Sequence, residues 1–410
     1  MKKFAKISVF CVLAVLCGFF AYALASTPFL ELKNYPSNVT LSYDDIKNIN
    51  SNKIFGKFIT THTNDIICTN SIGTNNVRLT FKLFNLITVK VVNVDVKDVE
   101  VLTGGNIVGF SLNSNGVIVI GSSPVTTESG NINTLEKTDL KAGDIILEIA
   151  GEKINRISDV ENIINKEENQ DKELDVLIKR KDNQKEIKIK PAKDLHSQKF
   201  KLGIWIKDDV SGVGTLTYIR TDNNRFGALG HAISDAETKR PIEIGGGDMY
   251  NCTVIGHTKA VKGKPGEIKA LFIQGSNSLG KVDKNTKYGV FGTYNQDKLE
   301  KLKKETPIKT GGRLNVKPGK AKIRVSLDNE KPKDYDIEII KTNYQNLSSD
   351  KSMVIRVTDK ELLKKTGGII QGMSGSPIIQ NEKVVGAVTH VFVSDPTKGF
   401  GVYLDWMINE

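Results

Sequence analysis

The chain has 410 residues, 39% hydrophobic and 26% charged, which is long enough for two or three domains with separate cores. Its net charge of +11 comes mostly from lysines that are scattered among acidic residues. Because no stretch alternates aromatic and basic residues, the charge predicts no nucleic-acid binding and fits only weak contact with an anionic membrane.

The N-terminus carries a membrane-directing segment. A short basic start precedes an uncharged, apolar stretch from Ile7 to Ala25. A helix of that length can just span a bilayer, whereas Ala23-Leu-Ala-Ser26 also fits a cleavage site. We therefore expect residues 1–26 to be either a removed signal peptide or a membrane anchor. In both cases the rest of the chain is exported across the membrane.

Residues 27–97 form a β-rich region to which no chemistry can be assigned. Asn76–Leu83 alternates apolar and polar residues, which predicts a strand, and His62 is expected at the surface. Cys68 and Cys252 lie in different regions, and their spacing leaves a disulfide between them open. The sequence contains neither C-x-x-C nor H-E-x-x-H, so it predicts no metal site and no cofactor.

Residues 98–193 predict a compact α+β unit with a helix at Ser158–Asn165, capped by Ser158. The unit resembles a PDZ domain, most strongly at Ala142–Gly151. PDZ domains bind a peptide as an added strand and hold its carboxylate in a backbone nest. The resemblance implies that this nest is formed by Ile107, Val108, Gly109 and Phe110. The alternative is a spacer or an intramolecular clamp without a peptide ligand.

Residues 194–410 consist of many short predicted strands with glycine-rich turns, interrupted by a lysine-rich helix at Asp297–Lys304. Strands without alternating helices favour a barrel or a sandwich over a parallel sheet. A segment of this length is suited to a pair of small β-barrels.

A candidate nucleophile lies in the sequence Gly372-Met-Ser374-Gly-Ser-Pro377. Two apolar residues, a polar turn and an apolar run to Val393 follow, which predicts a hairpin behind an exposed hydroxyl. A serine hydroxyl needs a base to take its proton, and acyl transfer places negative charge on the substrate oxygen. The N–H groups of Gly372 and Ser374 are the expected donors to that oxyanion.

The pattern resembles the nucleophile loop of chymotrypsin-like serine peptidases. That resemblance implies a mainly β fold with a double β-barrel peptidase domain. One departure is Met373, which stands where the trypsin group has an aspartate, so the buried charge pair of such an aspartate with a new N-terminus is not available.

Three histidines of the last region are candidates for the base. His231 follows a glycine and precedes a polar turn, which predicts a position at a strand end beside a cleft. His257 and His390 lie within predicted strands, where a core role is commoner. Placement therefore favours His231.

The carboxylate that would orient the base is less well defined. Asp235 is only four residues after His231 and could simply close a turn. Asp359 could cap a short helix, Lys360–Lys365, but Thr358 forms the better capping box, which would leave Asp359 free.

The order of these motifs resembles the stage IV sporulation protein B family of serine peptidases from endospore-forming bacteria. The PDZ domain is followed by Gly230-His-Ala-Ile-Ser-Asp235, the Ser374 motif and Ala387-Val-Thr-His390. The resemblance implies that His231, Asp359 and Ser374 form the catalytic set.

The family resemblance also implies a secreted or membrane-anchored endopeptidase in the space between forespore and mother cell. Such an enzyme cleaves itself and a membrane-bound regulator, so that an intramembrane protease can activate a late sigma factor. The PDZ domain would hold the substrate or the enzyme's own N-terminal region. A catalytically inactive PDZ scaffold that tethers partners at the membrane is the rival interpretation.

Overall fold

The computed structural model describes residues 37–41, 59–67, 75–96, 99–181, 183–235, 241–302, 305–313, 315–343 and 349–410. The apolar N-terminal segment and Cys68 lie outside these ranges, so the predictions about a signal or anchor helix and about a disulfide to Cys252 stay predictions. Within the described ranges, no helix is long and apolar enough to cross a membrane.

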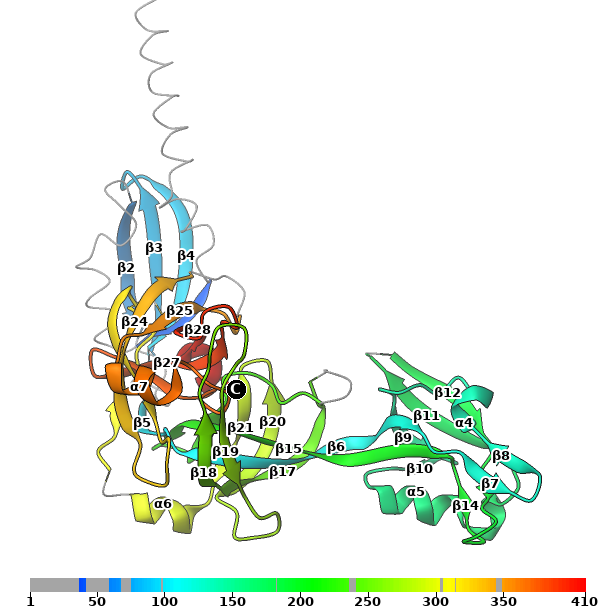
Figure 1. The fold of residues 1–410 in the computed structure, drawn as a ribbon. Coiled ribbons are helices and arrows are strands. Elements are labelled where there is room, and N and C mark those ends of the chain that lie inside the picture. The colour runs from blue at the N-terminus through cyan, green and yellow to red at the C-terminus, as the bar shows by residue number, and fades with distance from the viewer. Residues whose placement is uncertain are drawn as a thin grey trace, which may run out of the picture.

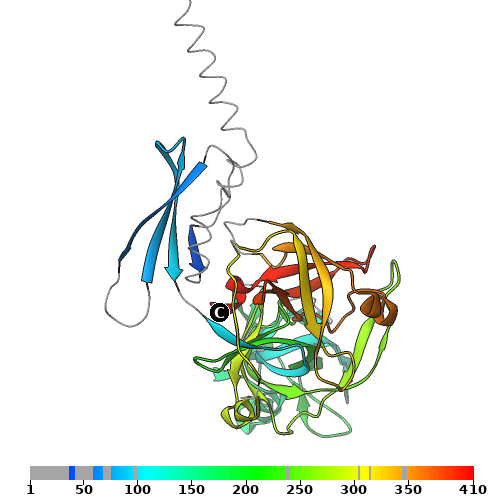
Figure 2. The same cartoon turned by 90° about the vertical axis from the view of Figure 1, so that its left-hand side faces the viewer.

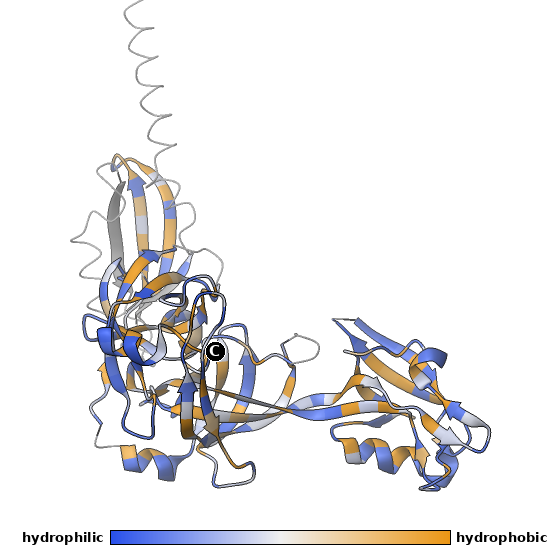
Figure 3. Ribbon diagram, viewed as in Figure 1, coloured by the Kyte–Doolittle hydropathy of each residue, from blue (hydrophilic) through white to orange (hydrophobic). Residues whose placement is uncertain are grey.

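A small N-terminal sheet has the strand order β1-β4-β3-β2. Its strands are β1 (Asn38–Leu41), β2 (Ile59–Ile67), β3 (Asn75–Leu83) and β4 (Ile87–Val96). Strand β3 confirms the predicted strand at Asn76–Leu83. Buried residues alternate along it at Val77, Leu79, Phe81 and Leu83, as expected for a sheet with one buried face. In Figure 1 this sheet lies above the barrels, and Figure 3 shows hydrophobic and hydrophilic residues alternating along β3 and β4.

The first barrel has six strands that close through the pairing of β6 with β15. They are β6 (Ile107–Ser122), β17 (Ile244–Asn251), β20 (Gly280–Thr286), β21 (Gly289–Tyr294), β16 (Arg225–Ala228) and β15 (Ile204–Arg220). Buried aliphatic and aromatic residues such as Phe110, Phe226 and Met249 fill its interior. Strands β5 (Glu100–Thr103) and β22 (Ile308–Lys309) extend the sheet beside β15.

Two of these strands are much longer than the barrel needs. β6 and β15 run side by side out of the barrel and end in the PDZ domain, as Figure 1 shows. Between the two bodies they carry polar residues at Asn113–Asn115 and Lys207–Asp209, which are drawn as hydrophilic in Figure 3. The PDZ domain is thus inserted between two strands of the first barrel. We expected the domains to follow one another, with boundaries near residues 98 and 194. The structure differs because β5 and the first half of β6 belong to the barrel.

The PDZ domain packs one helix against a small sheet and adds short strands at its far end. Helix α5 (Ile157–Ile164) begins one residue before the predicted cap Ser158, and the carboxylate of Asp159 instead accepts hydrogen bonds from the N–H groups of Asn155 and Arg156. Buried residues such as Val160, Ile146 and Val176 form the core. The remaining elements are β7 (Val125–Thr127), β8 (Gly130–Ile132), α4 (Thr134–Lys137), β9 (Ile145–Ile149), β10 (Glu152–Lys153), η1 (Glu167–Asn169), β11 (Leu174–Arg180), β12 (Asn183–Ile189), β13 (Ala192–Lys193) and β14 (Phe200–Lys201).

The second barrel is a closed ring of six strands in the order β23-β24-β25-β28-β27-β26. Figure 2 views it together with the first barrel below and the N-terminal sheet beside them. Its strands are β23 (Gly319–Val325), β24 (Lys333–Thr342), β25 (Met353–Val357), β28 (Lys398–Tyr403), β27 (Lys383–Val391) and β26 (Pro377–Gln380). The predicted mainly β fold with two barrels is therefore confirmed.

Four further elements surround the barrels. The lysine-rich helix is present as α6 (Gln296–Leu302), and helices α7 (Lys360–Thr366) and α8 (Leu404–Ile408) belong to the second barrel. The hairpin of β18 (Thr253–Thr258) and β19 (Glu267–Leu271) lies beside the loop that precedes β26, because Gln371 bridges to Glu267.

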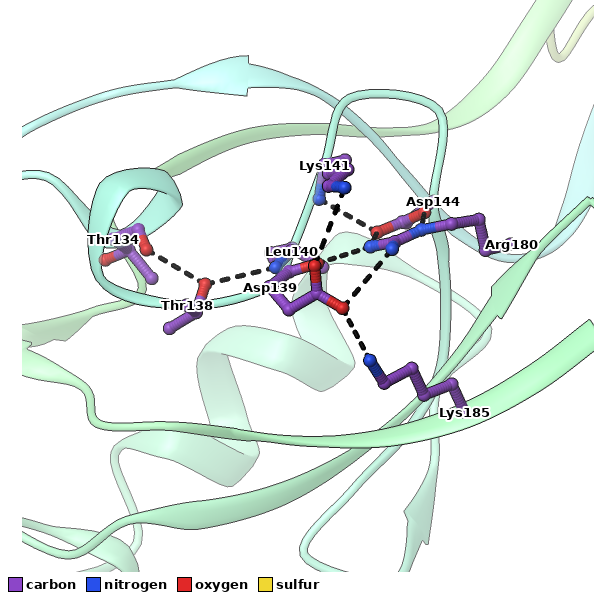
Figure 4. A network of polar contacts seen from close by, with 8 residues as sticks. All are labelled: Thr134, Thr138, Asp139, Leu140, Lys141, Asp144, Arg180 and Lys185. Carbon is purple, nitrogen blue, oxygen red and sulfur yellow. Dashed lines mark hydrogen bonds and ion pairs between the residues drawn. The ribbon is translucent and has the colours of Figure 1, made fainter.

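A buried carboxylate stabilises the PDZ motif that the sequence analysis singled out. Asp144 is 1% exposed and accepts two hydrogen bonds of 2.8 Å from the guanidinium of Arg180 and one from the N–H of Lys141. Figure 4 shows Arg180 between Asp144 and Asp139. These carboxylates raise the pKa of Arg180 above its ordinary value, with the hydrogen bond to Asp144 as the largest cause. The aspartate of the motif is therefore structural.

Replacing this carboxylate should destabilise the protein measurably. Asp144→Asn keeps the shape but removes the charge that pairs with Arg180, and we expect a loss of about 2 kcal/mol in the free energy of unfolding. Urea denaturation followed by circular dichroism measures it. As a matched control, Asp175→Asn removes the exposed partner of Lys188 and should change stability by less than about 0.5 kcal/mol. Equal effects of the two variants would contradict this account.

Candidate active site

The candidate nucleophile lies on a turn between α7 and β26. We call Gly372–Gly375 the serine turn. The predicted hairpin follows it as β26 and β27, with Asn381 and Glu382 in the left-handed region at its tip. Met373 is fully buried in the core of the second barrel, so an apolar contact stands where the trypsin group has an aspartate.

Two buried threonines of β15 bind the serine turn from the first barrel. Thr215 donates from its N–H to the carbonyl of Ser374 (2.8 Å) and from its hydroxyl to the carbonyl of Gly372 (2.7 Å). The hydroxyl of Thr217 donates to the carbonyl of Gly375 (2.7 Å). Both threonines are 0% exposed, so these bonds are shielded from water. The turn is therefore held by a strand more than 150 residues away in sequence.

The close approach of the strand explains the glycine at position 375. Its φ is +96°, and a Cβ there would lie 2.0 Å from the carbonyl oxygen of Thr215 and 2.4 Å from the nitrogen of Leu229. Only glycine fits this position without moving backbone atoms.

The directions of two N–H groups of the serine turn are fixed by the hydrogen bonds of the carbonyls that precede them. The carbonyl that precedes Gly372 accepts from the N–H of Ile268 (2.8 Å), and the carbonyl that precedes Ser374 accepts from the N–H of Ser376 (2.9 Å). A trans peptide directs its N–H opposite to its carbonyl. Both N–H groups are thus fixed in direction, and neither has a hydrogen-bond partner among the residues that the structure describes. Two such N–H donors next to a serine hydroxyl are what an oxyanion hole requires.

His231 lies next to this turn, in the loop after β16. Its Nδ1 is 2.9 Å from the carbonyl oxygen of Ala232. Because a carbonyl only accepts, Nδ1 carries the proton and Nε2 has a free lone pair. Burial is the largest effect on this ring and lowers its pKa below the usual value of 6.5. The ring is therefore neutral, and able to accept a proton, at neutral pH.

The hydroxyl of Ser374 is close to the base but not bonded to it. It donates to the carbonyl of Thr389 (2.7 Å), and the ring of the next residue, His390, lies 5.0 Å from that of His231. The structure thus brings the two sequence-predicted groups to one place. A rotation of the serine side chain is needed before its proton can reach His231, as is common in peptidases without substrate.

The other histidine candidates have different surroundings. His257 lies in β18 with Nε2 3.2 Å from the carbonyl of Lys365, at the end of α7. The side chain of His390 is 43% exposed, packs against His231 with the two rings tilted, and lies 3.8 Å from the carboxylate of Asp350. His62 lies in β2, and its side chain is outside the described part.

Neither carboxylate that the sequence suggested is free to orient His231. Asp235 is 2% exposed and forms an ion pair with Lys207 of β15. Asp359 is the N-cap of α7: its Oδ1 accepts from the N–H of Leu362 (2.9 Å) and its Oδ2 from that of Asp336 (3.4 Å). Our expectation that Thr358 caps the helix and leaves Asp359 free is wrong.

The position of Asp359 also separates it from the base. It follows the end of β25, whereas Asp350, which lies beside His390, precedes the start of that strand. Five residues of strand span about 16 Å. The structure therefore does not bring Asp359 to His231.

The predicted carboxylate nest of the PDZ domain needs a correction as well. Ile107–Phe110 form the start of β6 and pair with β15 on one edge, and Val108–Phe110 also pair with β17 on the other. Because both edges are occupied, these backbone groups cannot bind an added peptide strand.

The chain has the architecture of the chymotrypsin-like serine peptidases: a double β-barrel in which a Gly-Met-Ser-Gly turn lies beside an imidazole. In this chain a PDZ domain is inserted into the first barrel. The profile of the family described as SpoIVB peptidase S55 matches residues 198–408, slightly more than half of the chain, and that of the PDZ domain matches 107–190. The chain therefore belongs to the SpoIVB peptidase S55 family and is a serine endopeptidase of sporulation. A comparison with curated proteins found no matching relative.

Sequence reasoning missed the residues that support the site. Thr215 and Thr217 could have been noticed as polar residues two apart in an otherwise apolar segment, on one face of a strand. Thr389 acts through its backbone carbonyl, and Asp350 lies in a loop, so neither left a local signal in the sequence.

The role of Asp359 can be tested with two substitutions. Asp359→Ala removes the cap and should lower the free energy of unfolding by about 1 kcal/mol. Asp359→Asn still accepts from Leu362 and should keep most of the stability and most of the rate at which a fluorophosphonate labels Ser374. Urea denaturation measures the free energy of unfolding, and labelling kinetics measure the rate at which Ser374 reacts. If Asp359 oriented His231 directly, both variants would lose labelling by orders of magnitude while remaining folded.

Proposed function

We propose that Ser374 is the nucleophile of this endopeptidase and that His231 is its general base and then its general acid. Nε2 of His231 takes the proton of the hydroxyl as Ser374 attacks the peptide carbonyl, and returns it to the leaving amine. The N–H groups of Gly372 and Ser374 then bind the oxyanion, each contributing about 3 kcal/mol to transition-state stabilisation. Water hydrolyses the resulting acyl-enzyme by the same route.

The observation that carries this proposal is the pair of oriented N–H groups beside an accessible hydroxyl. Gly372 and Ser374 are half-buried, and neither N–H group has a partner among the described residues, so both donors are left for water or for a bound substrate oxygen. A scaffold without activity would have no need for them, and this is the argument against the inactive-scaffold alternative.

A serine-reactive probe separates the two alternatives. The wild-type protein should be labelled by a fluorophosphonate at Ser374, and Ser374→Ala should abolish both labelling and cleavage with an unchanged circular-dichroism spectrum and melting temperature. Ser376→Ala, two residues away, should leave labelling intact. An unlabelled but folded wild-type protein would refute the assignment of the nucleophile and favour the scaffold.

The substrates that we propose follow the family resemblance. They are the enzyme's own N-terminal region and a membrane-bound regulator, whose cleavage lets an intramembrane protease activate a late sigma factor. The apolar stretch from Ile7 to Ala25 supports export, either secreted or anchored, into the space between forespore and mother cell. The net charge of +11 supports additional weak contact with an anionic membrane.

We propose that the PDZ domain binds its peptide at the free edge of β15 and not at Ile107–Phe110. Residues Ile204–Ile206 pair with β6 on one side, and no described strand pairs with their other side. Helix α5 packs next to this segment, and Asn165 at its end bonds the backbone of Phe200. Gly203, with φ of +69°, turns the chain into the strand. An extended peptide fits between such a strand edge and helix.

Hydrogen exchange can locate the bound peptide. When a synthetic peptide spanning residues 27–58 is added to full-length Ser374→Ala, we expect slower amide exchange at residues 200–208 and unchanged exchange at 107–112. Binding with protection at 107–112 would contradict the proposed groove. Absence of binding to this peptide would contradict the proposed recognition of the N-terminal region.

A further inference from the structure

The site lacks a carboxylate bonded to its base, because Nδ1 of His231 donates to the carbonyl of Ala232. A carboxylate in that position normally stabilises the imidazolium that forms when the serine loses its proton. The question is which group supplies this stabilisation here.

Two residues outside the proposed catalytic pair converge on His231. The ring of His390 lies 5.0 Å from that of His231 with an angle of 34° between the planes. Nδ1 of His390 is 3.8 Å from Oδ2 of Asp350. His390 therefore lies close to both the ring of His231 and the carboxylate of Asp350.

Asp350 is held beside His390 by Thr389, the residue that also bonds the hydroxyl of Ser374. The hydroxyl of Thr389 donates to the carbonyl of Asp350 (3.1 Å), and the carbonyl of Thr389 accepts from the hydroxyl of Ser374 (2.7 Å). Ser352, two residues after Asp350, donates from its N–H to Gly401 of β28 and from its hydroxyl to Ser349. The loop that carries Asp350 is thus tied to both β27 and β28.

We propose that Asp350 and His390 take the place of the third triad member: His390 packs against the base as a positioning residue, and Asp350 supplies the negative charge that stabilises protonated His231. This proposal rests on the assignment of His231 and Ser374 as base and nucleophile. It differs from the carboxylate that the family resemblance implied, since Asp359 caps a helix.

The charges around the two rings agree with this arrangement. The carboxylate of Asp350 favours the protonated form of both histidines, whereas burial lowers the pKa of each and His231 lowers that of His390 further. Lys351 of the same loop opposes the charge of Asp350 at His390 and lies over the ring of Phe400 on β28. Ser374 and Thr389, which approach from the serine turn and β27, are neutral. Among the described groups, Asp350 is therefore the source of negative charge for the base.

If Asp350 stabilises protonated His231, its removal should change the pH profile of labelling in a particular way. The second-order rate of fluorophosphonate labelling of the full-length protein should fall below a midpoint that lies under pH 6.5, because protonated His231 cannot act as a base. In Asp350→Asn the midpoint should shift further down, by roughly half to one pH unit, since the protonated base has lost its nearest negative charge. The plateau rate should fall about tenfold, as expected when a nearby charge is lost from a partly shielded site.

His390→Phe is the second test variant. It keeps an aromatic ring packed against His231 and removes the imidazole whose titration is coupled to that of His231. We expect the plateau rate to stay within about threefold and the acid limb to become a single ionisation step. Glu361→Gln, which removes an exposed carboxylate of α7 in the same barrel, should leave rate and profile unchanged. If Asp350→Asn does not fold, the pH profile of labelling in His390→Phe still tests the proposal.

Three results would overturn the proposal: an unmoved acid limb in Asp350→Asn, an acid limb in His390→Phe that keeps more than one ionisation step, or the same shift in Glu361→Gln. A purely structural role of Asp350 would lower the rate without moving the limb. Failure of this inference is distinguishable from failure of the proposed function, because in the latter case the wild-type protein would not be labelled at Ser374 at all.

Discussion

One residue of the first barrel, Thr215 in β15, contacts both halves of the site. Its N–H and hydroxyl bind the carbonyls of Ser374 and Gly372, and its own carbonyl accepts from the N–H of Leu229, two residues before His231. The distance between nucleophile and base is therefore set by backbone hydrogen bonds to a single buried strand position. Backbone hydrogen bonds leave few rotatable bonds between the groups that they hold, which suits a site that must be oriented before substrate arrives.

The same strand connects the site to the PDZ domain. β15 begins beside α5, where we place the peptide, and continues without interruption to Thr215 and Thr217. Near its start, Lys207 pairs with the buried carboxylate of Asp235, four residues after His231. A peptide added to the edge of β15 thus contacts a strand that also binds the loop of the base and the serine turn. The insertion of the PDZ domain between two barrel strands makes this continuity possible.

The parts that the sequence predicted are those with local patterns. The Gly-Met-Ser-Gly turn, its hairpin, the strand-rich barrels and the PDZ motif at Ala142–Gly151 have residue signatures within one or two elements. The insertion of the PDZ domain was missed because nothing local distinguishes a long strand shared by two bodies from two short ones. Asp359 was misjudged because capping depends on backbone angles at the helix start, and Thr358 has an equally suitable side chain. Asp350 was missed because only the folded barrel brings its loop to His390.

The central claim is that hydrogen bonds from β15 hold the serine turn with the N–H groups of Gly372 and Ser374 ready for an oxyanion. A crystal structure of the protein labelled by a fluorophosphonate tests it most directly. We predict that the phosphoryl oxygen lies about 3 Å from both nitrogens and that the bonds from Thr215 to the turn are unchanged. A phosphoryl oxygen that faces solvent, or a turn that has left β15 to accommodate the adduct, would contradict the account.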